Sequence, residues 1–211
     1  MVKRFSYETD GNLKLSEHFV VKEFASVNGK RLYCDDVLID TEIIDLLEKL
    51  FAYMKASKIV ITSGYRCTQH EKEVGNASGK GYHVTGQAVD INVWKNNSTR
   101  YTQKEIVLAL EDLEWRKGIG LINSDTAVHI DNRATQYYFD ERNGNRTIGT
   151  SFYNHYGVKK ETELDKAVDK LANANIITSA DYWKNKKERI KNISQFNNNV
   201  DSLIIKVASK I

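Results

Sequence analysis

The sequence predicts an α+β fold, in which a few helices flank a small antiparallel sheet and a small helical module follows at the C-terminal end. Three observations support this: apolar residues at helical spacing, short β-branched runs bounded by turns, and a change of character after Gly157. With 211 residues and 41% hydrophobic residues, the chain can bury a real core. We expect a main domain over residues 1–150 and the helical module over 151–211.

The N-terminal part predicts an irregular arm, one helix and one strand. Residues 1–35 form the arm, in which Ser16 is a candidate N-cap of a short helix within "LSEHFVVKEFASVNG". Asp40 then caps a helix over "TEIIDLLEKLFAYMKA", whose apolar positions repeat at helical spacing: Ile43, Leu47, Leu50 and Met54. The β-branched run "KIVITS" predicts a buried strand that ends in the turn "SGYR".

The middle of the chain predicts the rest of the sheet. "QAVDINV" alternates, so Val89, Ile91 and Val93 face the core while Asp90 faces away from it. A capping box in "TQKE" opens a helix over "EIVLALEDL". "GIGLI" and "AVHID" are expected to pair as strands across the turn "NSDT".

The C-terminal module is predicted from three amphipathic or capped segments. The first is "ELDKAVDKLANANII", and "SADYWKNKKERIKNI" and "VDSLIIKVASKI" follow with Ser179 and Asp201 as candidate caps. Residues 151–211 contain 11 Lys/Arg and 7 Asp/Glu, a balance of +4, whereas residues 1–150 carry 20 against 21. A basic appendage suits an anionic surface such as a cell wall or nucleic acid.

Several classes of protein are excluded. No window reaches the roughly 18 apolar residues of a membrane span, so we expect no membrane insertion. No groove-entering motif supports a nucleic-acid partner.

The first residues lack the apolar run of a signal peptide, so we expect synthesis in the cytoplasm and another route of exit. Cys34 and Cys67 are interpreted as free thiols rather than a disulfide framework.

Two histidines and one aspartate form a candidate metal site. His83 and Asp90 are seven residues apart, and His129 shares a strand face with Asp131, opposite Val128 and Ile130. Three N/O ligands leave a fourth tetrahedral position open for water. Gly86 would allow the tight turn between the first two ligands. The alternative is a polar turn that runs into an ordinary strand.

Three motifs in this order, "SGYR", "YHVTGQAVDI" and "VHID", resemble the M15 family of zinc peptidases, with its pattern SGYR … SxHxxGxAxD … H. The segments "LSEHFVVKEFAS" and "VGNASGKGYH" are similar to its branch in phage endolysins and bacterial cell-wall enzymes, and the resemblance covers about residues 12–140. It implies Zn²⁺ held by His83, Asp90 and His129, with bacterial peptidoglycan as the substrate. Arg66 matches the family arginine that steadies the substrate and the transition-state charge.

The chain departs from the family pattern at two positions. The serine of SxH is Tyr82, a candidate to line the cleft, and the acid three residues before the last ligand is Thr126. Two nearby acids are candidates for the general base: Asp131, which could instead orient a ligand histidine, and Asp125, which could instead be a turn former. His70 is a further candidate for substrate contact, or a structural histidine.

These observations predict a zinc peptidase that cuts peptidoglycan stem peptides, as a phage-type endolysin acting on the wall after release. One alternative is a D-Ala-D-Ala carboxypeptidase, and another is a non-hydrolytic, metal-containing wall-binding protein. The segment "NIITSADYWKN" resembles the ends of some clostridial cell-wall hydrolases, which implies a wall-binding role for the module. Tyr182 and Trp183 are then either ligand-stacking residues or part of a small helical core.

Overall fold

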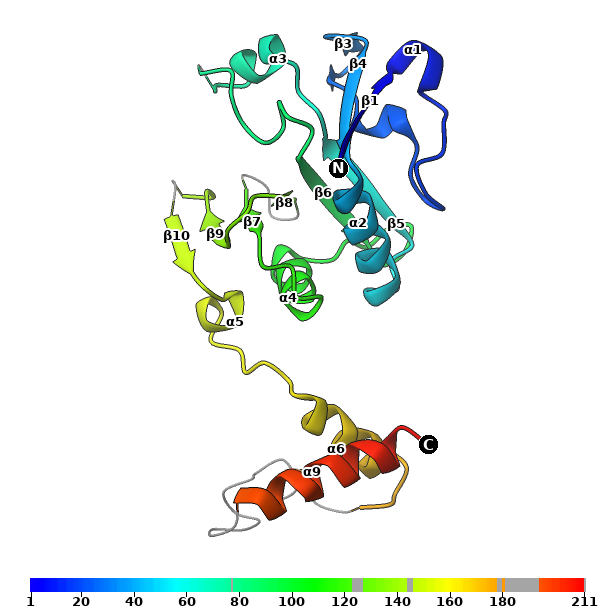
Figure 1. Cartoon of the computed structure of the whole chain (residues 1–211), viewed down its shortest axis with the longest axis vertical. Helices are drawn as coiled ribbons and strands as arrows, with labels where there is room; N and C mark the ends of the chain where they lie inside the picture. The colour runs from blue at the N-terminus through cyan, green and yellow to red at the C-terminus, as the bar shows by residue number, and fades with distance from the viewer. Residues whose placement is uncertain (77, 123–126, 144–145, 178–179, 181–193, 211) are drawn as a thin grey trace. The chain divides into compact units, whose positions relative to one another are not determined.

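A computed structural model describes the chain except for residues 77, 123–126, 144–145, 178–179, 181–193 and 211. The described residues form two compact units, Met1–Gly157 and Val158–Ile211 (Figure 1). The sequence predicts the boundary between the main domain and the helical module after residue 150. The first unit extends further because α5 (Phe152–His155) belongs to it: Phe152 is fully buried in the main core and stacks on Tyr138.

The first unit is built on a six-stranded sheet, and the predicted α+β class is confirmed. The strand order is β10-β9-β7-β8-β6-β5. The strands are β5 (Lys58–Ser63), β6 (Ala88–Trp94), β7 (Gly118–Leu121), β8 (Val128–Asp131), β9 (Tyr137–Asp140) and β10 (Arg146–Gly149). All neighbours are antiparallel except β7 and β9, which are parallel. The predicted pairing of "GIGLI" with "AVHID" is confirmed as β7 with β8.

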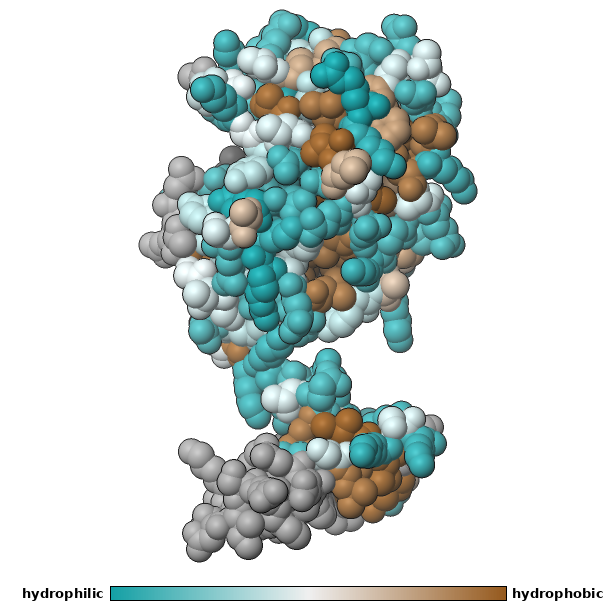
Figure 2. Space-filling view, in the orientation of Figure 1, coloured by the Kyte–Doolittle hydropathy of each residue, from teal (hydrophilic) through white to brown (hydrophobic). Residues whose placement is uncertain are grey.

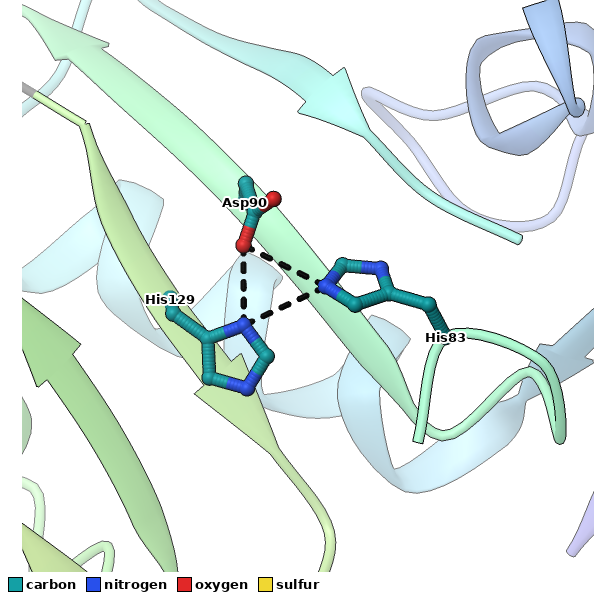
Figure 3. A group of neighbouring side chains, drawn as sticks. All are labelled: His83, Asp90 and His129. Carbon is teal, nitrogen blue, oxygen red and sulfur yellow. Dashed lines mark hydrogen bonds and ion pairs between the residues drawn. The ribbon is translucent and has the colours of Figure 1, made fainter. Parts of the chain in front are cut away.

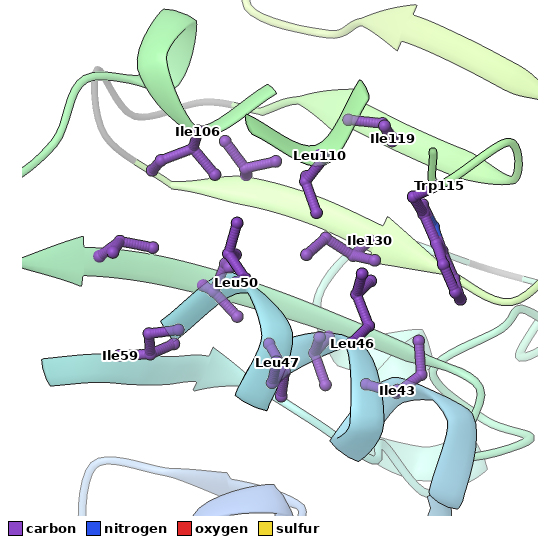
Figure 4. Packing of buried hydrophobic residues seen from close by; sticks show 14 of the residues in the cluster. Ile43, Leu46, Leu47, Leu50, Ile59, Ile106, Leu110, Trp115, Ile119 and Ile130 are labelled. Carbon is purple, nitrogen blue, oxygen red and sulfur yellow. The ribbon is translucent and has the colours of Figure 1, made fainter. Parts of the chain in front are cut away.

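Two helices contribute to the main core together with the strands of the sheet. α2 (Thr41–Tyr53) begins at the predicted cap Asp40, and α4 (Gln103–Asp112) begins at the predicted capping box of Thr102 and Glu105. Figure 4 shows their buried side chains meeting apolar residues of the sheet. Val89, Ile91 and Val93 of β6 are at most 2% exposed, as the alternation predicted. The opposite face of β6 and β8 is therefore available for polar side chains.

The N-terminal arm is more regular than the sequence indicated. β1 (Val2–Ser6) pairs antiparallel with β4 (Asp36–Asp40), and β2 (Val27–Asn28) pairs with β3 (Arg31–Leu32). The short helix expected from Ser16 is wrong, because only a 3-10 turn, η1 (Val21–Phe24), forms there after an extended Val20. Two short helices complete this unit, α1 (Tyr7–Asp10) and α3 (Thr68–Glu73).

The second unit contains α6 (Glu163–Asn173) and α9 (Ser194–Ala208) around a small core of Ala167, Leu171 and Ala208. Asp201 lies inside α9 and is not its cap, because the helix begins seven residues earlier. Apolar side chains also reach the surface of this unit, among them Leu203, Ile205 and Val207 (Figure 2). The residues outside the described part of the chain include Ser179, Tyr182, Trp183 and the basic residues within 181–193. None of the described helices is long and apolar enough to cross a membrane.

Candidate metal centre

Register brings two of the predicted ligands together. In the antiparallel pair of β6 and β8, Asp90 lies directly opposite His129. Opposed residues on one face of such a pair have neighbouring side chains, and His129 Nδ1 lies 2.8 Å from Asp90 Oδ1. The alternation that sends Val89 and Ile130 into the core therefore places both ligands on the other face.

The turn before β6 brings in the third ligand, His83. Its Nδ1–H donates to the Gly64 carbonyl oxygen at 2.7 Å, which leaves Nε2 unprotonated and directed at the other two ligands. Gly86 has a φ of +72°, and a Cβ there would lie 2.5 Å from the Leu38 carbonyl carbon. Glycine is therefore required at this turn, both for its backbone conformation and for its close approach to β4.

The three donor atoms form a compact triangle (Figure 3). Its edges are 2.8 Å between His129 Nδ1 and Asp90 Oδ1, 3.2 Å between His129 Nδ1 and His83 Nε2, and 3.4 Å between His83 Nε2 and Asp90 Oδ1. Ligands about 2.0–2.1 Å from a tetrahedral zinc ion would be about 3.3 Å apart. The donor set and its spacing therefore fit Zn²⁺. Of the residues the structure describes, these are the three grouped so as to hold a metal ion.

Charge in this cluster is tightly coupled. Burial opposes the ionisation of Asp90, but His83 and His129 hold the pKa of this carboxyl well below its ordinary value. Burial also opposes the protonation of His129, yet hydrogen bonds to Asp131 and Asp90 raise its pKa to about 9. The cluster therefore strongly favours positive charge at its centre, which is the charge that a metal cation supplies.

Arg66 is fixed beside the ligands by hydrogen bonds from all three of its guanidinium nitrogens. Its Nε donates to Ser63 Oγ at 2.7 Å, Nη1 to Glu71 Oε2 at 3.0 Å and Nη2 to Asp90 Oδ2 at 2.8 Å. Asp90 thus directs Oδ1 at the histidines and Oδ2 at the guanidinium. Glu71 is itself buried and accepts a further hydrogen bond from Asn76. The arginine is therefore part of a hydrogen-bonded, largely buried group of side chains.

Asp131 lies behind His129. Its Oδ2 accepts the Nε2–H of His129 at 3.0 Å, and both of its oxygens accept hydrogen bonds from Arg133. The carboxyl is fully buried, and although burial opposes ionisation, Arg133 and His129 lower its pKa to about 2. Gly118 makes room for it, since a Cβ there would lie 2.2 Å from the carboxyl carbon. Of the two roles expected for Asp131, this geometry favours orienting the ligand histidine.

An open cavity of about 560 Å³ lies over the centre. The predicted residues that line it are Arg66, Tyr82, His83, Asp90 and His129. His70 is not among the lining residues: it is buried against Ser26, at 3.0 Å, and stacked on Tyr33. These contacts agree with a structural role for His70 rather than with contact to the substrate. Asp125 and Thr126 lie outside the described residues.

The cavity also has lining residues that the sequence reading did not single out: Glu71, Arg133, Tyr137, Phe139 and Glu141. Glu71 lies five residues after Arg66, in α3, a helix that was not predicted from the sequence. Tyr137, Phe139 and Glu141 come from β9 or its end, which reaches the site through a parallel pairing with β7. No local pattern indicates that pairing.

Replacing Asp131 with asparagine is expected to weaken zinc binding by about 10-fold to 100-fold, because the partner that orients His129 loses its charge. Competition with a chromophoric chelator would measure the affinity. Asp140→Asn is the matched control, since Asp140 holds Arg142 in the same way but does not line the cavity. Unchanged zinc affinity with collapsed activity would instead assign Asp131 to proton transfer.

The fold and the centre together define a class of protein, an α+β domain with an open cavity over a His–Asp–His cluster that could hold a metal ion. The Peptidase M15 family model matches residues 17–131, which is more than half of the chain and includes all three ligands. This chain belongs to the Peptidase M15 family. Comparison with curated proteins and with solved structures gave no match.

Proposed function

We propose that this chain is a zinc-dependent peptidase that hydrolyses peptidoglycan stem peptides, as a phage-type endolysin made in the cytoplasm and acting on the wall after release. The observation that carries the proposal is the His83–Asp90–His129 triangle in a member of a peptidase family. When bound, zinc supplies Lewis acidity that polarises a carbonyl and lowers the pKa of a water molecule. Residues around the triangle would stabilise the charge on the carbonyl oxygen and accept the proton of the water molecule.

Arg66 is placed to stabilise negative charge on the reacting carbonyl oxygen. It lines the cavity next to two of the ligands, and its guanidinium is held in place by Glu71 and Asp90. Donors whose orientation is fixed before the reaction need no reorganisation as charge develops, and this lowers the barrier. The exposed part of the side chain, 17%, is available to the substrate.

A general base is needed to accept the proton of the attacking water, and a carboxylate can serve as one. Asp131 is unsuited, because it is fully buried and both of its oxygens are engaged by His129 and Arg133. Glu141 lines the cavity, is exposed, and forms no ion pair with the residues the structure describes. We assign the proton acceptor to Glu141, with Asp125, which lies outside the described residues, as the alternative.

Glu141→Gln is expected to lower kcat on stem peptides by about 100-fold or more, while zinc content is unchanged, because only the proton acceptor is lost. Asp125→Asn, assayed in parallel, is expected to retain activity. The reverse result would transfer the role to Asp125. If both variants keep full activity, this account of proton transfer is wrong.

Incubation with purified cell walls tests the function itself. The zinc-loaded chain is expected to release new amino groups from the wall, and a chelator is expected to stop that release. Mass spectrometry of the fragments separates an internal cut from the loss of one terminal D-Ala, which would indicate a carboxypeptidase. Sedimentation with walls but no chelator-sensitive release of amines would favour a non-hydrolytic binding protein.

A further inference from the structure

Arg133 lines the cavity and is held rigidly. Its Nε donates to Asp131 Oδ1 at 2.7 Å and its Nη2 to Asp131 Oδ2 at 2.5 Å, a bidentate pair. The guanidinium carbon lies 4.9 Å from the ring centre of Tyr82 and 4.4 Å from that of Tyr137. Because these contacts fix the side chain before any ligand arrives, binding an anion there costs little conformational entropy.

In the ion pair of Asp131 and Arg133, the residue that lines the cavity is the positively charged Arg133. The Asp131 side chain is 0% exposed and that of Arg133 is 19% exposed, so the carboxylate is covered and the guanidinium is reached from the solvent. Nη1 forms no hydrogen bond with another residue of the described chain. A planar guanidinium with free donors is matched by a carboxylate, to which it gives strong, directional hydrogen bonds.

The flanking aromatic residues suit a peptide. Tyr82 and Tyr137 are 38% and 39% exposed, and both line the same cavity as the metal ligands. Their rings provide apolar contact area for the aliphatic parts of a chain whose carboxylate meets the guanidinium. Stem peptides carry such free carboxylates, and in some walls these groups are amidated.

We propose that Arg133 binds a carboxylate of the peptide substrate, so that the enzyme selects stem peptides in which this group is free over those in which it is amidated. The inference rests on the proposed peptidase function and names a specificity determinant for it. Arg133 also links this anchor to the metal centre, since the same Asp131 orients His129.

A second Asp-x-Arg motif provides a matched control. Arg142 contacts Asp140 as Arg133 contacts Asp131: the backbone N–H and Nε donate to Oδ1, and Nη2 donates to Oδ2. Arg142 does not line the cavity. Arg142→Gln therefore removes the same charge from the same local geometry without changing the proposed anchor.

The test uses the zinc-loaded full-length chain and synthetic stem peptides whose carboxylates are amidated one at a time. Amidation of the carboxylate that Arg133 binds is expected to lower kcat/KM by about 10-fold to 100-fold in the wild type and in Arg142→Gln. In Arg133→Gln the preference for the free acid over the amide is expected to disappear, because the free acid reacts more slowly. Arg133→Lys, which keeps a cation beside Asp131 and so protects the fold, is expected to show an intermediate preference.

Calorimetric binding of the same peptides gives a readout that does not depend on cleavage. The wild type is expected to bind the free acid at least about 10-fold more tightly than the amide, and Arg133→Gln is expected to bind both equally. Equal binding of acid and amide by the wild type would overturn the inference. So would a uniform loss of rate in Arg133→Gln with the preference retained. If no peptide is cut but the difference in binding is present, the proposed hydrolysis fails and the anchor stands.

Discussion

Replacing Asp90 with alanine is expected to abolish specific zinc binding and to reduce peptidase activity by at least about 1000-fold, because the site loses its anionic ligand. Asp90 contacts the other residues of the centre through its carboxylate. His129 and Arg66 are hydrogen-bonded to this carboxylate, and His83 Nε2 lies 3.4 Å from it. Zinc content by atomic spectroscopy and amine release from cell walls would measure the two effects.

Asn92→Ala is the control for this change. Asn92 lies on the same face of β6, two residues beyond Asp90, and its side chain makes no hydrogen bond through Oδ1 within the described structure. It is expected to keep both zinc and activity. An Asp90→Ala protein that binds one zinc as tightly as the wild type would contradict the assignment of the ligands.

Replacing Arg66 with alanine is expected to have the second large effect. In the metal-free chain it removes the guanidinium that pairs with the buried carboxylates of Glu71 and Asp90, and removing one partner of a buried pair costs about 3–5 kcal/mol. In the zinc-loaded chain we expect activity to fall by about 100-fold or more, since a fixed donor beside the reacting carbonyl is lost. Denaturant unfolding and wall digestion measure the two losses separately.

Arg31→Ala is the matched control, because Arg31 pairs with Glu73 of the same helix, α3, at the same 3.0 Å. The side chains of Arg31 and Glu73 are 53% and 41% exposed, against 17% and 5% for Arg66 and Glu71. Solvent screens an exposed pair, so we expect a loss below about 1 kcal/mol and full activity. Equal destabilisation by the two changes would show that burial does not govern the contribution of Arg66.

Part of the site could be predicted from the sequence because strand alternation determines which side chains share the polar face, whereas the pairing of β6 with β8 was not predicted. The period of two in "QAVDINV" and "VHID" places Asp90 and His129 on the polar face, and the pairing of β6 with β8 sets them opposite each other. The turn at Gly86 could be predicted too, since a positive φ favours glycine. Helix starts at Asp40 and Thr102 followed from capping residues whose hydrogen bonds are local.

The remainder depends on contacts between distant segments. β1 pairs with β4 across more than thirty residues, so the arm had no local signal of a strand. The role of Asp131 depends on Arg133 and on the space left by Gly118, which only the tertiary structure reveals. Glu141 reaches the cavity through the parallel pairing of β9 with β7. Local patterns, together with the resemblance to M15 peptidases, therefore predicted the candidate ligands, but not the residues that support them.

The central claim is that one zinc ion, held by His83, Asp90 and His129, makes this chain a peptidoglycan peptidase. The most direct measurement titrates zinc into the metal-free protein and follows bound zinc and amine release from purified walls in the same samples. The account predicts that activity rises in proportion to bound zinc and reaches its plateau at one ion per chain. Full amine release from the metal-free chain, or none at one bound zinc, would contradict it.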